Sequence, residues 1–356
     1  MVHFELGHQV LCGLHDGFPR GGFRDGPGVM TVEFFATPAD NSTVLPDLAA
    51  HAPENPFLTS AYFKARKHLG AEAWIIGLKE RQRLHSAAGA FITRGRLNSR
   101  IEVASLPAAA ADRQYWSGLL RFASQHRITE IEGNSFASPM VTVPVLTEEV
   151  ERTPRCEYLV DLNDFRIDNL SSNHRRNIRK ASVRKLTSTR STDLTACREH
   201  VRLMSLSHDR RRRRGEVIHG GSDVDRLMPL LTCGCGELFQ ASADREVLSS
   251  ILVLRASKGA YYQSAGTAPE GMTLGASHFL IYSVMCQLKE DGVRVFNLGG
   301  APVGSTLARF KGGFGAAAVS LTSVMLYTGS RWRSRLTTLV KLARSEWAEF
   351  SHESGE

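Results

Sequence analysis

A glycine-rich stretch near the end of the chain, from Phe296 to Gly315, constrains the fold more than any other twenty residues. The apolar run from Val293 to Leu298 predicts a buried strand that stops at Gly299 and Gly300. Because glycine permits positive φ and adds no side-chain bulk, the loop after this strand can wrap closely around a small reacting group. Lys311 supplies a mobile cation there, so the stretch predicts a site suited to acyl transfer.

Length and composition predict a soluble protein of two domains. The chain has 356 residues, more than a usual single domain, so two separate cores are expected. A hydrophobic content of 42% and a charged content of 22% are typical of globular proteins. No apolar run approaches the ~18 residues of a membrane span, and the N-terminus lacks a basic segment followed by an apolar one. We therefore expect a cytoplasmic protein.

The six cysteines predict neither a disulfide framework nor a metal centre. They are too few and too scattered for a disulfide scaffold in a chain of this length. Cys233 and Cys235 form half of a possible metal site, but no second pair of ligands has matching spacing. Two small buried thiols are the simpler interpretation, and no metal is expected.

Positive charge is concentrated on one segment. The net charge of the chain is +8, whereas residues 166–214 carry 15 Lys or Arg and four Asp or Glu. Such a segment can attract phosphates, or it can be a solvated helix face that keeps the protein soluble. Five consecutive arginines, Arg210 to Arg214, favour contact with an anion, because adjacent like charges repel one another.

The pattern of predicted elements repeats once along the chain. Strands at 73–78, 87–93 and 100–105 precede a helix at 115–126 and a strand at 128–131. Later, strands at 249–256 and 261–266 precede a helix at 277–291 and a strand at 293–298, and a last strand follows at 317–327. We therefore predict a mixed α/β (α+β) fold of two tandem copies, each a mainly antiparallel sheet flanked by helices.

The expected boundaries follow from this repeat. Residues 1–50 are expected to be an N-terminal extension or lid, and residues 51–155 the first domain. Residues 156–330 are expected to form the second domain, which carries the active site, and residues 331–356 a C-terminal helix.

Two motifs resemble a known family. The element Phe310-Lys311-Gly312-Gly313-Phe314-Gly315 follows a helix that stops at Gly292 and a strand that closes in a glycine pair. This order resembles the end of the second domain in the Fem-type (FemABX) transferases of the GNAT-like acyltransferase superfamily. The basic segment from Ser172 to Ala181 resembles the helix that begins that domain. The resemblance covers about residues 55–328 and implies two tandem GNAT-like domains.

The resemblance also implies roles for individual residues. An amine that attacks an activated ester passes through a tetrahedral oxyanion, which a fixed cation stabilises. In the resembling family the Phe-Lys pair lies beside the terminal adenosine of aminoacyl-tRNA, which implies a catalytic or orienting role for Lys311 and Phe310. The alternative is a surface lysine in a glycine-rich turn. Substrate and tRNA are expected at Arg175, Arg179, Lys180, Arg211, Arg213, Gly275, Gly299 and Gly300.

The donor expected from the resemblance is aminoacyl-tRNA rather than acyl-CoA. Acyl-CoA enzymes of the superfamily hold the pyrophosphate of CoA on a loop at the start of a helix. In this loop an Arg or Gln stands three residues before a glycine. Aligned on Gly275, this chain has Met272 at the Arg or Gln position. The departure argues against ordinary CoA binding, and a simple helix cap is the alternative role of these small residues.

A general base is not singled out by the sequence. His278, His174, Asp161 and Glu270 are candidates by position, and each can equally be a cap or a surface group. Fem-type enzymes can also work without one, because the amine can lose its proton to the substrate or to water.

The sequence thus predicts a Fem-type aminoacyltransferase that forms an amide bond on an amine acceptor, either a cell-wall peptide precursor or a small molecule of an antibiotic pathway. Aminoacyl-tRNA is the co-substrate, and no other cofactor is expected. An N-acyltransferase that uses acyl-CoA or a carrier-protein thioester is the alternative. A third possibility is a basic RNA-binding module whose transferase site has decayed.

Overall fold

The computed structural model describes residues 32–41, 44–80, 83–96, 98–136, 141–216 and 223–329. Residues 1–31 of the expected N-terminal extension or lid, and the helix expected over 331–356, lie outside these residues. Residues 32–50 belong to the sheet and its flank, because strand β1 (Val32–Pro38) pairs with β2 (Glu72–Glu80) and is followed by helix α1 (Val44–His51). None of the helices in the described ranges is long and apolar enough to cross a membrane.

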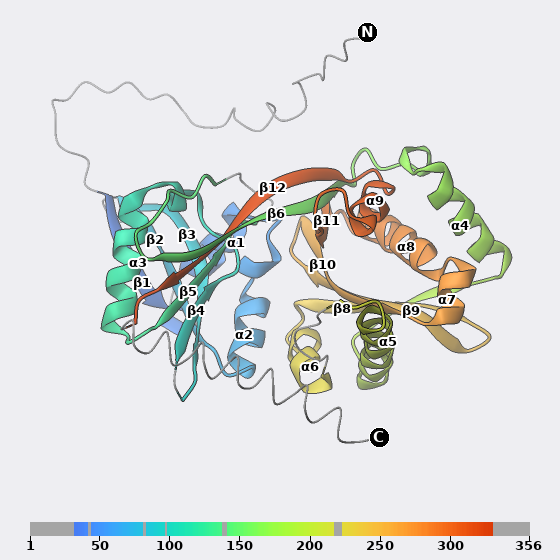
Figure 1. The fold of residues 1–356 in the computed structure, drawn as a ribbon, viewed down its shortest axis with the longest axis horizontal. Helices are drawn as coiled ribbons and strands as arrows, with labels where there is room; N and C mark the ends of the chain where they lie inside the picture. The colour runs from blue at the N-terminus through green and yellow to red at the C-terminus, as the bar shows by residue number, and fades with distance from the viewer. Residues whose placement is uncertain are drawn as a thin grey trace, which may run out of the picture. The chain divides into compact units, whose positions relative to one another are not determined.

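Within the described residues, all strands belong to one mixed sheet of twelve strands (Figure 1). The sheet has the order β1-β2-β3-β4-β5-β12-β6-β11-β10-β9-β8-β7. The remaining strands are β3 (Arg83–Arg94), β4 (Ser99–Val103), β5 (Glu130–Asn134), β6 (Glu149–Asp161), β7 (Thr187–Ser191), β8 (Gly236–Ala243), β9 (Glu246–Arg255), β10 (Gly259–Thr267), β11 (Val295–Gly300) and β12 (Ala317–Tyr327).

The helices of these ranges lie on both faces of the sheet. They are α2 (Ser60–His68), α3 (Arg113–Gln125), α4 (Ser172–Val183), α5 (Leu194–Arg212), α6 (Val224–Thr232), α7 (Pro269–Leu274), α8 (Ala276–Glu290) and α9 (Thr306–Gly312), besides α1. In the second half, α4, α8 and α9 lie on one side of the sheet, and α5 and α6 lie on the other (Figure 1).

The sheet contains the same topology twice. Strands β1 to β4 pair antiparallel in sequence, and helix α3 then crosses over to β5, which lies parallel to β4. Strands β7 to β10 repeat this antiparallel order, and helix α8 crosses over to β11, which lies parallel to β10. The predicted fold of two tandem mixed, mainly antiparallel units is therefore confirmed.

Two long strands join the halves. Strand β12 pairs antiparallel with β5 of the first half along one edge and with β6 along the other, and β6 pairs in turn with β11. The expected boundary between residues 155 and 156 falls inside β6, and the assignment of separate domains stays a prediction. Figure 1 shows β6 and β12 running side by side between the halves.

Alternation along β9 explains how the second half builds two core layers. Ile251 and Val253 pack in one buried cluster with Leu280 and Val284 of α8. Leu252 and Leu254 point to the opposite face, into a cluster that contains residues of α5 and α6. Successive strand residues alternate in direction, so this apolar strand is covered by helices on both faces.

The Phe-Lys element was predicted as part of a loop, but it lies in a short helix. Ser305 accepts a hydrogen bond from the amide of Ala308 through its side chain, which caps a short helix, α9, that holds Phe310 and Lys311. A capping serine satisfies an amide that would otherwise lack a partner, so a glycine-rich segment can begin a helix. Lys311 therefore projects from a helix rather than from a flexible turn.

Candidate active site

A cavity of about 870 Å³ lies where β10 and β11 stop pairing with each other. Their parallel register covers three pairs, the last between Tyr261 and Asn297, and a bulge follows in β10 between Tyr262 and Ser264. Beyond these pairs, side chains from both strands, from helices α7 to α9 and from the end of α5 line the cavity. Its walls are Arg211, Arg214, Glu216, Tyr262, Ala265, Gly271, Met272, Gly275, Ser277, His278, Ile281, Leu298, Pro302, Ser305, Thr306, Leu307, Phe310 and Lys311.

Lys311 is a buried cation in the cavity wall. Its side chain is 7% exposed, and Nζ donates a 2.8 Å hydrogen bond to the carbonyl oxygen of Gly300. Burial lowers the pKa of Lys311 to about 8, although the carboxylate of Glu157 opposes that shift. An ammonium has three donors, and within the described residues the Gly300 carbonyl accepts one of them, so two are available to a ligand. The alternative of a surface lysine is wrong.

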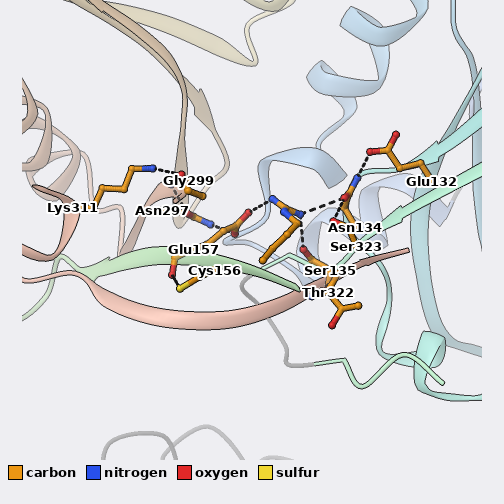
Figure 2. Close-up of polar contacts among 12 residues, drawn as sticks. Glu132, Asn134, Ser135, Cys156, Glu157, Asn297, Gly299, Lys311, Thr322 and Ser323 are labelled. Atoms are coloured by element: carbon orange, nitrogen blue, oxygen red, sulfur yellow. Dashed lines mark hydrogen bonds and ion pairs between the residues drawn. The ribbon is translucent and has the colours of Figure 1, made fainter. Parts of the chain in front are cut away.

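A buried polar network supports the turn that holds Lys311 (Figure 2). The Asn297 side chain accepts a 2.7 Å hydrogen bond from the Gly299 amide and donates one of 2.7 Å to Glu157. The other oxygen of Glu157 accepts from Arg155 at 2.8 Å. Because Glu157 is 1% exposed, its charge needs these donors. The network fixes the position of the Gly300 carbonyl and, through it, of the lysine.

Gly299 cannot be replaced without disturbing this turn. Its φ is +75°, which side-chain-bearing residues rarely adopt. A Cβ at this position would lie 3.3 Å from the Tyr262 carbonyl oxygen and 3.6 Å from Lys311 Nζ. Backbone conformation and lack of space therefore both require glycine beside the lysine.

An aromatic group backs the cavity at Phe310. The Phe310 ring contacts His278 and His174, with ring centroids 5.1 and 5.4 Å apart, and Phe314 at 5.3 Å. The contacts with His278 and Phe314 are edge-to-face and the contact with His174 is tilted, and such packing orients the rings and excludes water. Phe310 is half-buried and lines the cavity beside Lys311, as an apolar wall that lowers the local dielectric around the ammonium.

His174 holds the backbone of Phe310 in place. Its Nε2 donates to the Phe310 carbonyl oxygen at 2.9 Å, so Nδ1 of the neutral ring accepts from the Ser171 hydroxyl at 2.8 Å. Burial lowers the pKa of His174, which favours this neutral form. The residue is 4% exposed and packs behind the cavity wall, so its position suits a structural role better than that of a base.

Among the four candidate bases, His278 is the one that lines the cavity. Burial, with a smaller contribution from His174, lowers the pKa of His278 to about 4. The ring is therefore neutral at pH 7 but weakly basic. Asp161 and Glu270 are exposed and do not line the cavity.

Gly275 has a clear structural role. It adopts φ +76°, ends α7 and begins α8, and a Cβ there would lie 2.7 Å from the Asn177 carbonyl oxygen. The segment aligned with the pyrophosphate loop is therefore a short helix with a left-handed glycine at its end. Met272 projects from that helix, is 57% exposed and lines the cavity.

The structure brings part of the predicted site together. Lys311, Phe310, Gly275 and Arg211 line the cavity, and Gly299 and Gly300 lie behind Lys311. The α4 residues do not line it: Arg175 donates to the carbonyls of Asp168 and Leu170, whereas Arg179 and Lys180 are exposed on the helix surface. Arg213 is also exposed and outside the cavity wall.

Several residues of the site were not found by sequence reasoning. Glu157 and Asn297 were missed because each stands in an apolar strand, and a buried acid gains meaning only when its partner strand is known. The one available signal was a charged residue beside the apolar run Tyr158 to Val160. Glu216 and Tyr262 gave no signal, since they come to the cavity through the end of α5 and the bulge in β10.

Comparison with known proteins defines the class of this fold and site. Residues 169–312, which include α4 to α9 and the cavity walls, match the model of an acetyltransferase (GNAT) domain. The chain thus carries a GNAT-like acyltransferase domain. A search with the sequence found no match among curated proteins.

Solved structures extend the likeness to both halves. The fold is similar to that of FemX, with a TM-score of 0.59 and 13% identity, over 79% of this chain and 96% of that one. It is also similar to a tandem GNAT protein from the clavulanic acid biosynthesis pathway, with a TM-score of 0.50 and 11% identity, over 84% of this chain and 99% of that one. The predicted Fem-type resemblance within the GNAT-like proteins is confirmed at the level of the domain and the fold.

Proposed function

We propose that the chain transfers an aminoacyl group from aminoacyl-tRNA to an amine acceptor in the Lys311 cavity and forms an amide bond without a further cofactor. The observation that carries this proposal is the buried ammonium in the cavity wall, tied to the Gly300 carbonyl. A cation held in place at low dielectric stabilises an oxyanion far better than a mobile surface lysine would.

The chemistry assigned to the site is an aminolysis. The acceptor nitrogen adds to the ester carbonyl carbon, and the two unused N–H groups of Lys311 receive the negative charge that develops on the carbonyl oxygen. Collapse of this intermediate breaks the bond to the ribose oxygen. The proton of the amine passes to that leaving oxygen or to water. The reaction therefore does not need a strong base, which the weakly basic His278 would not supply.

The segment from Met272 to Gly275 supports aminoacyl-tRNA over CoA as donor. An exposed methionine stands where CoA enzymes carry Arg or Gln, and Gly275 serves as a helix cap against Asn177. An uncharged side chain offers a pyrophosphate no charge-assisted hydrogen bond. We assign the donor contacts of the cavity to Arg211 and Gly275, with Gly299 and Gly300 holding Lys311.

An acyltransferase that uses acyl-CoA or a carrier-protein thioester is the second candidate. The match of residues 169–312 to an acetyltransferase domain and the separation of β10 from β11 favour it. The same addition to a thioester carbonyl would use Lys311 in the same way, with a thiolate as leaving group.

The acceptor proposed is a cell-wall peptide precursor or a small molecule of an antibiotic pathway, in keeping with a fold shared with FemX and with a protein of clavulanic acid biosynthesis. The exposed basic residues of α4, Arg179 and Lys180, are proposed as further contacts to RNA or nucleotide phosphates. A cytoplasmic location fits such substrates.

The deciding experiment offers purified protein a mixed pool of charged tRNAs, a panel of acyl-CoAs and a pool of amine acceptors, and detects amides by mass spectrometry. The proposal predicts transfer that disappears after RNase treatment and returns with fresh charged tRNA. Transfer that survives RNase and needs acyl-CoA would establish the second candidate, and transfer from neither donor would contradict both.

A further inference from the structure

The structure separates the five consecutive arginines by what each contacts. Arg212 pairs with Asp209 at 2.9 Å on the helix surface, outside the cavity wall. Arg211 and Arg214 instead line the cavity. The run is therefore not one uniform basic face, and two of its members are placed to meet a ligand.

The cavity-lining arginines share a single carboxylate. Glu216 accepts from Arg211 Nε at 2.7 Å through one oxygen and lies 3.1 Å from Arg214 Nη2 through the other. Two guanidinium groups around one anion form an arrangement that also suits phosphate, because the planar N–H fork of arginine matches phosphate oxygens as well as carboxylate oxygens. The side chains of Arg211, Arg214 and Glu216 are 47, 67 and 41% exposed, and ion pairs exposed to this degree are weak.

A third arginine of the run has an unmet need for an acceptor. Arg210 donates through Nη2 to the Ser207 hydroxyl at 3.0 Å, but its Nη1 is buried and has no hydrogen-bond partner in the described part of the chain. Burial, and to a smaller degree the charge of nearby Arg214, lowers the pKa of Arg210. Buried donors without an acceptor are costly, so this part of the arginine run has less negative charge around it than its guanidinium groups require.

We infer that Arg211 and Arg214 form a phosphate subsite at one end of the Lys311 cavity, and that Glu216 is an internal counterion which a donor phosphate displaces. This inference rests on the proposed function, in which the donor ends in an adenosine nucleotide. Phosphate next to adenosine is common to aminoacyl-tRNA and to CoA, and the test separates these two sources.

Glu216→Gln and Asp209→Asn provide a matched pair of variants. Each removes one carboxylate from an arginine ion pair in the same segment, but only Glu216 lines the cavity. Binding is measured by fluorescence anisotropy of a labelled single-stranded RNA ending in adenosine, and by calorimetry with CoA, at two salt concentrations. Circular dichroism shows whether each variant folds.

Loss of the internal competitor should tighten binding of the preferred probe about two- to tenfold in Glu216→Gln, as expected for two weak ion pairs. Asp209→Asn should change it less than about twofold. The double variant Arg211→Gln with Arg214→Gln should weaken binding at least fivefold and flatten its salt dependence. A response seen with RNA identifies a tRNA-type donor, and one seen with CoA identifies a CoA-type donor.

Three results would overturn the inference: equal effects of Glu216→Gln and Asp209→Asn, unchanged binding after loss of both arginines, or no binding of either probe to the unmodified protein. Failure of the proposed function is separate. A Lys311→Ala variant that keeps full turnover would refute the catalytic role of Lys311. It would not change the comparison of probe affinities among the Glu216, Asp209 and arginine variants, which tests the phosphate subsite by itself.

Discussion

Lys311 Nζ lies 2.8 Å from the carbonyl oxygen of Gly300 and donates a hydrogen bond to it. The catalytic candidate on α9 is thus tied to the turn that ends β11, and that turn is held by Asn297 and Glu157 beneath it. Position, protonation and burial of the lysine consequently depend on residues that do not line the cavity.

Replacing Lys311 by Met should stabilise the protein at neutral pH. Burial lowers the lysine pKa from 10.5 to about 8, so folding is penalised while the side chain is charged in both states. After allowance for the lost hydrogen bond, the free energy of unfolding at pH 7 should rise by about 1–2 kcal/mol.

The pH dependence of this effect has a definite sign. Between about pH 8 and 10.5 the unfolded chain binds more protons at Lys311 than the folded one, so the unmodified protein gains stability as pH rises. The advantage of the Met variant should therefore shrink over that range in urea unfolding curves. A Met variant that is less stable at pH 7 would contradict the buried-charge description.

Glu157→Gln should move the alkaline limb of the rate profile to lower pH. The carboxylate supports the charged form of Lys311, so its neutralisation lowers the lysine pKa further. The amide also cannot accept from both Arg155 and Asn297, which should cost about 2–3 kcal/mol of stability. Glu151→Gln, an exposed change on the same strand, is the control and should alter neither quantity in rate and unfolding measurements.

Substitution of two glycines separates backbone strain from crowding. Gly299 and Gly304 have φ values of +75° and +77°, but a Cβ at Gly304 would have nothing within 4 Å. Both alanine variants should lose about 1 kcal/mol of stability. Turnover should fall at least tenfold in Gly299→Ala alone, because its methyl group would press on the Tyr262 carbonyl at 3.3 Å and shift the turn that holds Lys311. Equal turnover in the two variants would show that the position of the lysine is not critical.

His278→Phe should retain most activity. The ring of Phe keeps the packing against Phe310, and a histidine with a pKa near 4 is a poor proton acceptor at pH 7. We expect kcat/KM to fall less than about tenfold in steady-state assays. A loss of about a hundredfold or more would instead identify His278 as a general base.

Local patterns predicted much of the fold. Strand β12 was predicted over its observed range of 317–327, and helix α8 differs from its prediction by one residue at each end, since apolar spacing and a terminal glycine are signals within the segment. Strands β7 and β8 and helix α6 were not predicted. Helix α6 contains Pro229, and the polar strand β7 draws its stability from pairing with β8.

The site could be predicted only where a motif carried it. Lys311 and Phe310 stand in a recognisable element. Which arginines of the run line the cavity depends on where α5 ends in space, and the sequence alone does not show that. Arg175 was expected to contact substrate or tRNA, but its side chain donates to the carbonyl of Leu170, a contact that its position in the basic segment does not reveal. Contacts between segments distant in sequence, such as Glu157 with Asn297, depend on strand order and cannot be read from spacing.

The most direct test of the account compares Lys311→Ala with Lys258→Ala, since Lys258 also donates to a glycine carbonyl, that of Gly292, but does not line the cavity. Aminoacyl transfer from charged tRNA and donor affinity are measured for both variants. A catalytic role for Lys311 predicts that Lys311→Ala loses about a hundredfold or more in kcat while donor affinity stays within about threefold, and that Lys258→Ala retains both. Full turnover in Lys311→Ala would contradict it.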